Sequence, residues 1–137
     1  AVTDGAVISD LVINGADISA SVGAGIIVGR ARNTTIKNIS INGSAVQTTG
    51  VGSAVGGVVG VGEQTTVDGA SLNSVSVSTI LDSTRATVET AGGVAGIFDG
   101  VIRAVKLSGV KVLSDAIGGG IVGGKNFGLY VGMTLVD

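Results

Sequence analysis

Ile36-Lys-Asn-Ile-Ser-Ile-Asn-Gly-Ser-Ala-Val46 is one of four segments of this chain that align with one another without gaps. The other three span 8–18, 67–77 and 102–112. The shared pattern is aliphatic, two variable residues, aliphatic, variable, aliphatic, Asn or Ser, Gly or Ser, two variable residues, and Ile or Val. A repeat period of about 20–50 residues is typical of solenoids, in which each repeat forms one coil and stacks on its neighbour.

A second motif, which we call the glycine box, recurs between the long segments. It is written Gly25-Ile-Ile-Val-Gly29 in the first repeat and returns at 56–60, 92–96 and 119–123. From each box to the next long segment the gap is 7, 7 and 6 positions, whereas from each long segment to the next box it is 7, 10, 15 and 7. Large insertions therefore fall at one junction per repeat, as expected when they bulge from one corner of a stacked coil.

The local pattern within each repeat favours strands. Ile39 and Ile41 alternate with polar residues at period two, which is the strand periodicity, and Asn42-Gly43 follows with the chemistry of a turn that needs positive φ. We expect a second short strand ending at Val46 and a third formed by the glycine box. The predicted fold is all-β, a right-handed parallel β-helix (β-solenoid) with about four to five coils of roughly 27 residues. It forms a single domain, 1–137, with repeats at about 1–22, 23–49, 50–90, 91–115 and 116–137.

Stacked coils place equivalent residues above one another, so each alignment column predicts a ladder. Two columns are expected in the interior, one along a corner as an amide ladder, and one outside with charges that alternate in sign. These columns are, in order, Ile8, Ile36, Val67, Ile102; Ile13, Ile41, Leu72, Leu107; Asn14, Asn42, Asn73, Ser108; and Ser9, Lys37, Asp68, Arg103.

Composition agrees with a narrow core and excludes several functions. The chain is 45% hydrophobic but only 2% aromatic, which suggests a core where bulky rings do not fit. Its formal net charge is -2 and it has no cluster of Lys or Arg, so we expect no nucleic-acid partner. Because His and Cys are absent, Ser-His-Asp and Cys-His triads, imidazole or thiolate zinc sites and disulfides are excluded.

Two features bear on localisation. The stretch 39–62 is uncharged for 24 residues, long enough to cross a bilayer, but it contains seven Gly and many polar side chains, so we expect no membrane span. The chain starts at Ala1 and its one Met is Met133, which a removed signal peptide would explain, as would trimming of the chain. We therefore expect a secreted or cell-surface protein.

Candidate catalytic motifs are weak. Gly119-Gly-Ile-Val-Gly-Gly-Lys125 resembles a phosphate-binding loop, but Asn126 stands where such a loop needs Ser or Thr. We predict no catalytic residue, cofactor site or metal site, and no enzyme. A polysaccharide-degrading β-helix remains a less favoured alternative, since such enzymes need a long groove. The main alternative is an ice-binding solenoid, because Thr34-Thr35 and Thr65-Thr66 stack in the predicted register.

The run from Gly56-Gly-Val-Val-Gly60 through Leu72-Asn-Ser-Val-Ser-Val77, and that from Gly92-Gly-Val-Ala-Gly96 through Leu107-Ser-Gly-Val-Lys-Val112, resemble the GLUG-type repeats of bacterial surface proteins. Such repeats occur in large adhesins and in non-catalytic regions of secreted immunoglobulin A proteases. The resemblance covers about residues 8 to 123, although the usual aromatic residues are missing and the third repeat has a long corner, 78–91. It implies a surface spacer or adhesive stalk and brings no catalytic residues.

An open solenoid exposes strand edges at both ends, and neither end of this sequence resembles a cap. We therefore expect the chain to bind itself, by stacking end to end into a fibre, or to form part of a longer rod. Since binding residues concentrate on loops held by a rigid scaffold, the long corner with Asp82, Arg85 and Glu89 is the candidate contact loop for a host surface or glycan.

Overall fold

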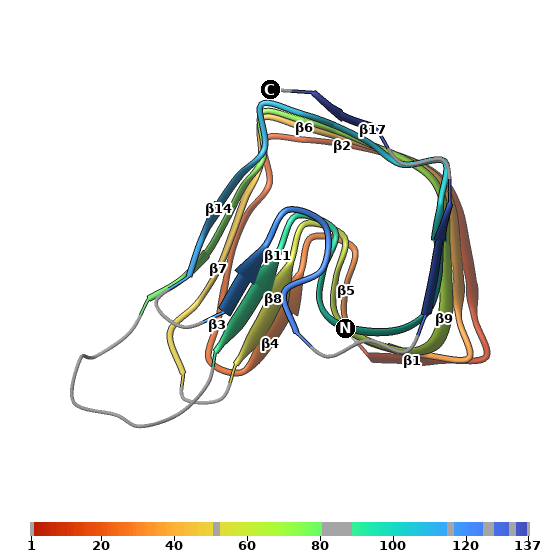
Figure 1. Cartoon of the computed structure of the whole chain (residues 1–137), viewed down its shortest axis with the longest axis horizontal. Coiled ribbons are helices and arrows are strands. Elements are labelled where there is room, and N and C mark those ends of the chain that lie inside the picture. The colour runs from red at the N-terminus through yellow and green to blue at the C-terminus, as the bar shows by residue number, and fades with distance from the viewer. Residues whose placement is uncertain are drawn as a thin grey trace.

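The computed structural model describes residues 2–50, 53–80, 89–114, 117–124, 128–131 and 134–136. Every regular element in these ranges is a β-strand, and every strand pairing is parallel. Seen along the stacking axis, the chain winds repeatedly around one path, so that successive coils lie over one another (Figure 1). The all-β class and the β-solenoid predicted from the repeats are confirmed.

The strands form three sheets that run along the stack. The main sheet has nine strands, and the side sheet and the inner sheet have four each. The main sheet contains β1 (Val2–Asp4), β2 (Val7–Asn14), β5 (Val28–Arg32), β6 (Thr35–Asn42), β9 (Val59–Asn73), β12 (Ala95–Arg103), β13 (Lys106–Ser108), β16 (Gly128–Val131) and β17 (Thr134–Val136). The side sheet contains β3 (Asp17–Ala20), β7 (Ala45–Thr48), β10 (Ser76–Thr79) and β14 (Lys111–Leu113), and the inner sheet β4 (Gly23–Gly25), β8 (Ala54–Gly56), β11 (Thr90–Gly92) and β15 (Ile117–Gly119).

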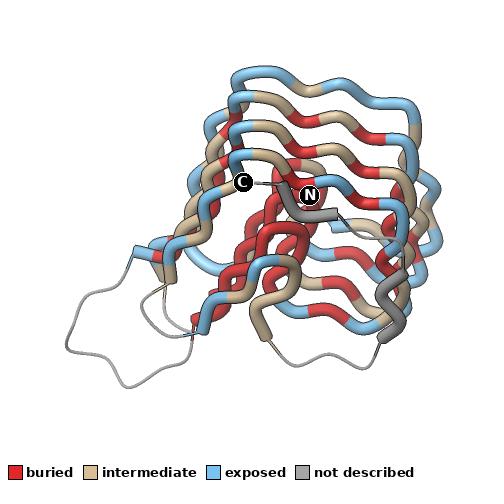
Figure 2. Tube along the Cα trace, turned by 45° about the horizontal axis from the view of Figure 1, so that its top comes forward, coloured by how far each residue is buried: buried red, intermediate tan, exposed pale blue. Residues whose placement is uncertain are grey.

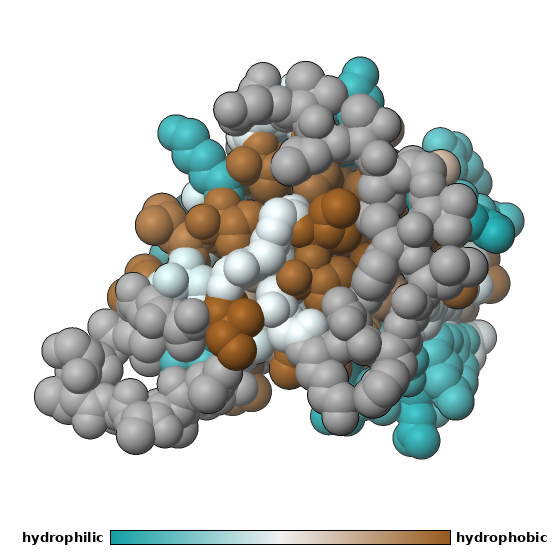
Figure 3. All heavy atoms as spheres, in the orientation of Figure 1, coloured by the Kyte–Doolittle hydropathy of each residue, from teal (hydrophilic) through white to brown (hydrophobic). Residues whose placement is uncertain are grey.

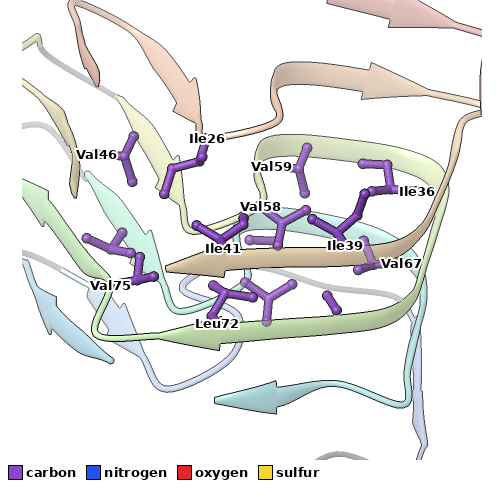
Figure 4. Close-up of a cluster of buried hydrophobic side chains, with 14 of the residues drawn as sticks. Ile26, Ile36, Ile39, Ile41, Val46, Val58, Val59, Val67, Leu72 and Val75 are labelled. Carbon is purple, nitrogen blue, oxygen red and sulfur yellow. The ribbon is translucent and has the colours of Figure 1, made fainter. Parts of the chain in front are cut away.

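The predicted interior columns are confirmed by the pairing register. Ile41 pairs with Ile13 on one side and with Leu72 on the other, and Leu72 pairs with Leu107. The Ile8 column pairs in the same way, through residues 36, 67 and 102. Members in the inner coils are at most 1% exposed, and Figure 4 shows several of them meeting in one cluster. Each such side chain contributes about 1.5–3 kcal/mol of burial free energy, so these columns hold the coils together.

The first coil is less well covered. Ile8 and Ile13 are only half-buried, because no described strand pairs with the outer edge of β2. In Figure 2 the outermost coil is largely pale blue because no described strand covers its outer edge, whereas the inner coils carry buried positions along their length.

The coils are longer than predicted. Hydrogen-bonded column partners are 28, 31 and 35 positions apart, rather than roughly 27. Val2 pairs with Arg30, Arg30 with Val61, and Val61 with Ile97, so the chain completes about three turns by Ile97, and β12 pairs with β16 in the turn that follows. The insertions that lengthen the later coils fall between β7 and β8 and between β10 and β11, at the predicted junction, and the strands on both sides keep their register.

The glycine box is a reversal of the chain, and the prediction of a third strand there was wrong. β4 ends at Gly25, a bend follows, and β5 begins at Val28. Figure 1 shows the result: β4, β8 and β11 run inside the winding, and the chain turns back at their ends. None of the box glycines has positive φ. They are required because two backbones meet there, and a Cβ on Gly25 would lie 2.6 Å from the Cα of Val59.

The corners use a different set of residues, which adopt left-handed backbone in matching columns. Values of φ between +46° and +73° occur in three columns, which are Gly5, Asn33, Gln64; Asp10, Asn38, Gly69, Ala104; and Gly15, Gly43, Ser74, Gly109. The first column has no such member in the fourth coil, where Gly100 has φ +144 and the pairing register shifts between Phe98 and Gly100. This irregularity accounts for the gap of 6 in place of 7 in the sequence.

One aromatic ring does fit the core, against the expectation from composition. Phe98 is fully buried and pairs in register with Gly62 of the preceding coil. A Cβ on Gly62 would lie 2.6 Å from the Phe98 ring, so the glycine provides the space that the ring occupies.

Candidate functional sites

The candidate contact loop connects β10 to β11. Asp82 and Arg85 lie outside the described residues, so their part of the prediction stays untested. Glu89 is fully buried, and its backbone carbonyl accepts a hydrogen bond from the Ile117 amide at 3.1 Å. The structure thus places Glu89 at the base of the corner, inside the protein, rather than on a contact surface.

Glu89 shares this base with a group of buried hydroxyl side chains, Thr48, Ser53, Thr79 and Thr90. Ser53 Oγ donates a hydrogen bond to Thr48 Oγ1 at 2.8 Å, and Thr48 pairs with Thr79 of the next coil. We did not predict this cluster, although polar residues flank the variable junction in each repeat. Activation of a hydroxyl nucleophile requires a base within hydrogen-bond reach that is itself oriented by a third group. One carboxyl group among threonines and a serine does not supply that arrangement.

The predicted outward charge column is confirmed, and it links neighbouring coils. Lys37 lies beside Asp68 in the strand register, and Arg103 Nε forms an ion pair with Asp68 Oδ2 at 2.9 Å. Glu63 forms a second link, 2.5 Å from Arg30 and 3.9 Å from Arg32. These side chains are 35–63% exposed. Exposed pairs contribute about 0–1 kcal/mol each, so their role is to favour the correct register rather than to hold the fold.

Polar ladders run along the corners. Asn42 Nδ2 donates to Asn14 Oδ1 at 2.9 Å, and Asn73 Nδ2 donates to Asn42 Oδ1 at the same distance, which confirms the predicted amide ladder. At the next corner, Asn38 Nδ2 donates to Asp10 Oδ1 at 2.5 Å. This hydrogen bond, helped by one from Ser9 and by the charge of Lys37, holds the pKa of Asp10 below its ordinary value of 3.8.

The threonines that suggested ice binding do not form an exposed face. Thr34 and Thr65 are 1% exposed, and their hydroxyls donate to the carbonyls of Arg32 and Glu63. Thr35 does pair with Thr66 as predicted, but Val7 and Val101 flank them in the same column. In the described ranges, no outward column carries more than these two adjacent threonines.

The remaining motifs have structural explanations. Gly119 to Gly123 form the fourth glycine box, where a Cβ on Gly119 would collide with the Val122 carbonyl oxygen, and Lys125 and Asn126 lie outside the described residues. A shallow groove of about 290 Å³ lies at the first coil, lined by Val2, Val22, Gly23, Gly29, Arg30 and Val61. Among the residues described, no three His, Cys, Asp or Glu side chains are placed to share a metal ion. The described segments also contain no apolar helix of membrane-spanning length.

Comparison with known proteins adds no relative. No protein-family model, no curated protein and no solved structure matches this chain. The resemblance to GLUG-type repeats therefore stays a prediction from the sequence motifs.

Proposed function

We propose that this chain is a non-enzymatic structural or adhesive module of a secreted or cell-surface protein. The observation that carries the proposal is that titratable and hydroxyl side chains make contacts that hold the coils together. Outside, Asp68 and Glu63 join neighbouring coils through ion pairs. Inside, Thr34 and Thr65 satisfy backbone carbonyls.

A module that bears load or spaces other domains needs a rigid shape rather than a cleft. The parallel columns supply that rigidity, since each coil adds the same aliphatic contacts and the same ladder of hydrogen bonds as the coil before it. The groove at the first coil is lined mostly by valine and glycine, with Arg30 already paired to Glu63. Such a lining offers a polysaccharide few hydrogen-bonding groups.

The test is incubation with a panel of soluble polysaccharides, followed by mass spectrometry of the products, together with binding to a glycan array. We expect no polysaccharide to be shortened. Glycan binding without shortening supports the adhesive form, and the absence of both supports the structural form. Shortening that disappears when the protein is denatured overturns the proposal, and so does thermal hysteresis of ice growth above the buffer value.

A further inference from the structure

Two pairs of strand edges remain open at opposite ends of the stack. In the side sheet the outer strands are β3 and β14, and in the inner sheet they are β4 and β15. Among the described residues, no strand pairs with the outer edge of any of these four. An open edge presents unpaired N–H and C=O groups, which another chain can pair with.

The two edges of the side sheet are complementary, with opposite charges outside and aliphatic residues inside. Asp17 and Lys111 are both exposed and occupy one column, through Ala45 and Ser76. In the adjacent column Ile18 and Val112 are half-buried, while Val46 and Val77 between them are buried. If β3 of one copy paired with β14 of another in the existing register, opposite charges would meet outside and the interior column would continue.

The inner sheet is also compatible with this pairing. β15 would lie beside β4, which places Gly118 and Gly119 next to Ala24 and Gly25. Gly25 and Gly119 have no room for a side chain, because a Cβ on either would collide with a backbone carbonyl oxygen, that of Val28 or that of Val122. Figure 3 views one end of the stack and shows brown aliphatic and pale small residues at its centre.

Charge is distributed unevenly along the stack, in the sense that favours head-to-tail contact. Residues 2–29 contain three acidic residues and no Lys or Arg. Residues 97–114 contain three basic residues and one acidic residue. The residues are Asp4, Asp10 and Asp17 in the first stretch, and Asp99, Arg103, Lys106 and Lys111 in the second.

The strands β16 and β17 already occupy part of the position that an incoming first coil would take. β16 pairs with β12, and β17 with β13, in the columns where β2 pairs with β6. A first coil from another copy offers β12 and β13 equivalent partners in β2, and it also pairs β14 and β15. Stacking therefore replaces the strands that it displaces and adds pairings that one copy alone leaves open.

We infer that two copies of this chain stack head to tail, with β3 of one copy beside β14 of the other, Asp17 next to Lys111, and β16 and β17 displaced. The inference rests on the proposed structural role and specifies its partner and its register. Head-to-tail contacts between two different surfaces of the same chain assemble identical chains into rings or open filaments.

The test uses single cysteines in a chain that has none of its own. Asp17→Cys and Lys111→Cys proteins, one of them bearing a small mass tag, are mixed in equal amounts and oxidised with oxidised glutathione. We expect the mixed 17–111 disulfide to exceed both the 17–17 and the 111–111 species. Paired positions in neighbouring strands lie about 4.8 Å apart, within the Cα range of a disulfide.

Lys106→Cys is the matched control, because Lys106 is another exposed lysine of the same coil but belongs to the column of Val12. Mixed with Asp17→Cys, it should give no excess of the mixed species. A statistical mixture at positions 17 and 111, or no disulfide at all, overturns the inference. So does hydrogen exchange that leaves β16 and β17 as protected in the linked dimer as in the free chain. If the mixed 17–111 disulfide does not form in excess and no polysaccharide is shortened, the stacking inference is wrong but the proposed structural role is not contradicted.

Discussion

Gly56 packs backbone to backbone against Ala95 of the following coil, and a Cβ atom on Gly56 would lie 2.6 Å from the Ala95 Cα. The same closeness recurs at the other boxes: a Cβ on Gly92 would lie 2.6 Å from the amide nitrogen of Gly123. The glycine box therefore folds each coil inward, and the inner sheet fills the interior that a simple loop would leave empty.

Replacing a box glycine should be far more damaging than replacing a corner glycine. Gly56→Ala places its methyl group against backbone that cannot move aside, and we expect a loss of about 3 kcal/mol or more. Gly15→Ala is the matched control, since Gly15 has φ +65 and no atom within 4 Å of its added Cβ. There only the left-handed backbone costs energy, about 1–2 kcal/mol. Urea unfolding measures both, and equal losses would contradict the steric role of the box.

The loss of stability caused by truncating a core side chain should depend on the coil in which that side chain lies. Ile41→Ala removes a fully buried side chain with column neighbours on both sides, and should cost about 2–5 kcal/mol. Ile13→Ala removes the half-buried end of the same column and should cost about half as much or less. Urea unfolding of the two variants gives the comparison. A larger loss for Ile13→Ala would mean that the first coil is covered in solution.

The sequence was sufficient to predict the class of fold and its register, because the columns depend on residue types that repeat at fixed positions. Ile36, Val67 and Asn42 pair with the predicted residues. The inward fold at the glycine box was not predictable from the same pattern. Glycine serves both positive φ and close backbone contact, and the sequence does not distinguish these uses.

The burial of Glu89 at the base of the long corner was not predicted, for a similar reason. Glu89 lies beside a corner whose length varies, and acidic residues in such loops are usually exposed. Its burial depends on threonines that come together only when the coils stack. Space for Phe98 depends in the same way on Gly62, a residue of the preceding coil.

The amide ladder should weaken most when its middle member is removed. Asn42→Ala breaks the hydrogen bonds to Asn14 and Asn73, and should cost about 1–2 kcal/mol. Asn14→Ala breaks one of these bonds at an exposed end and should cost about 1 kcal/mol or less. Thermal unfolding distinguishes the two, and a ladder without energetic value would give the same small change for both.

Lowering the pH should remove the stabilisation that ionised Asp10 provides through its hydrogen bond with Asn38. Because the folded pKa lies below the ordinary 3.8, ionised Asp10 stabilises the folded state at higher pH. That contribution is lost as the pH falls through the folded pKa. Titration followed by carboxyl-carbon NMR should give a low pKa for Asp10 and a higher pKa in Asn38→Ala. An unchanged pKa in this variant would assign the shift to another group.

The vertical register of the coils is tested most directly by methyl NOE spectroscopy on the protein in solution, with the Ile, Leu and Val methyl groups labelled. We expect cross-peaks from Ile41 to Leu72 and from Leu72 to Leu107, residues that lie far apart in the sequence but pair in neighbouring coils. Cross-peaks that instead connect Leu72 only to residues near it in the sequence, or to methyl groups outside its column, would contradict the stacked fold and the function argued from it.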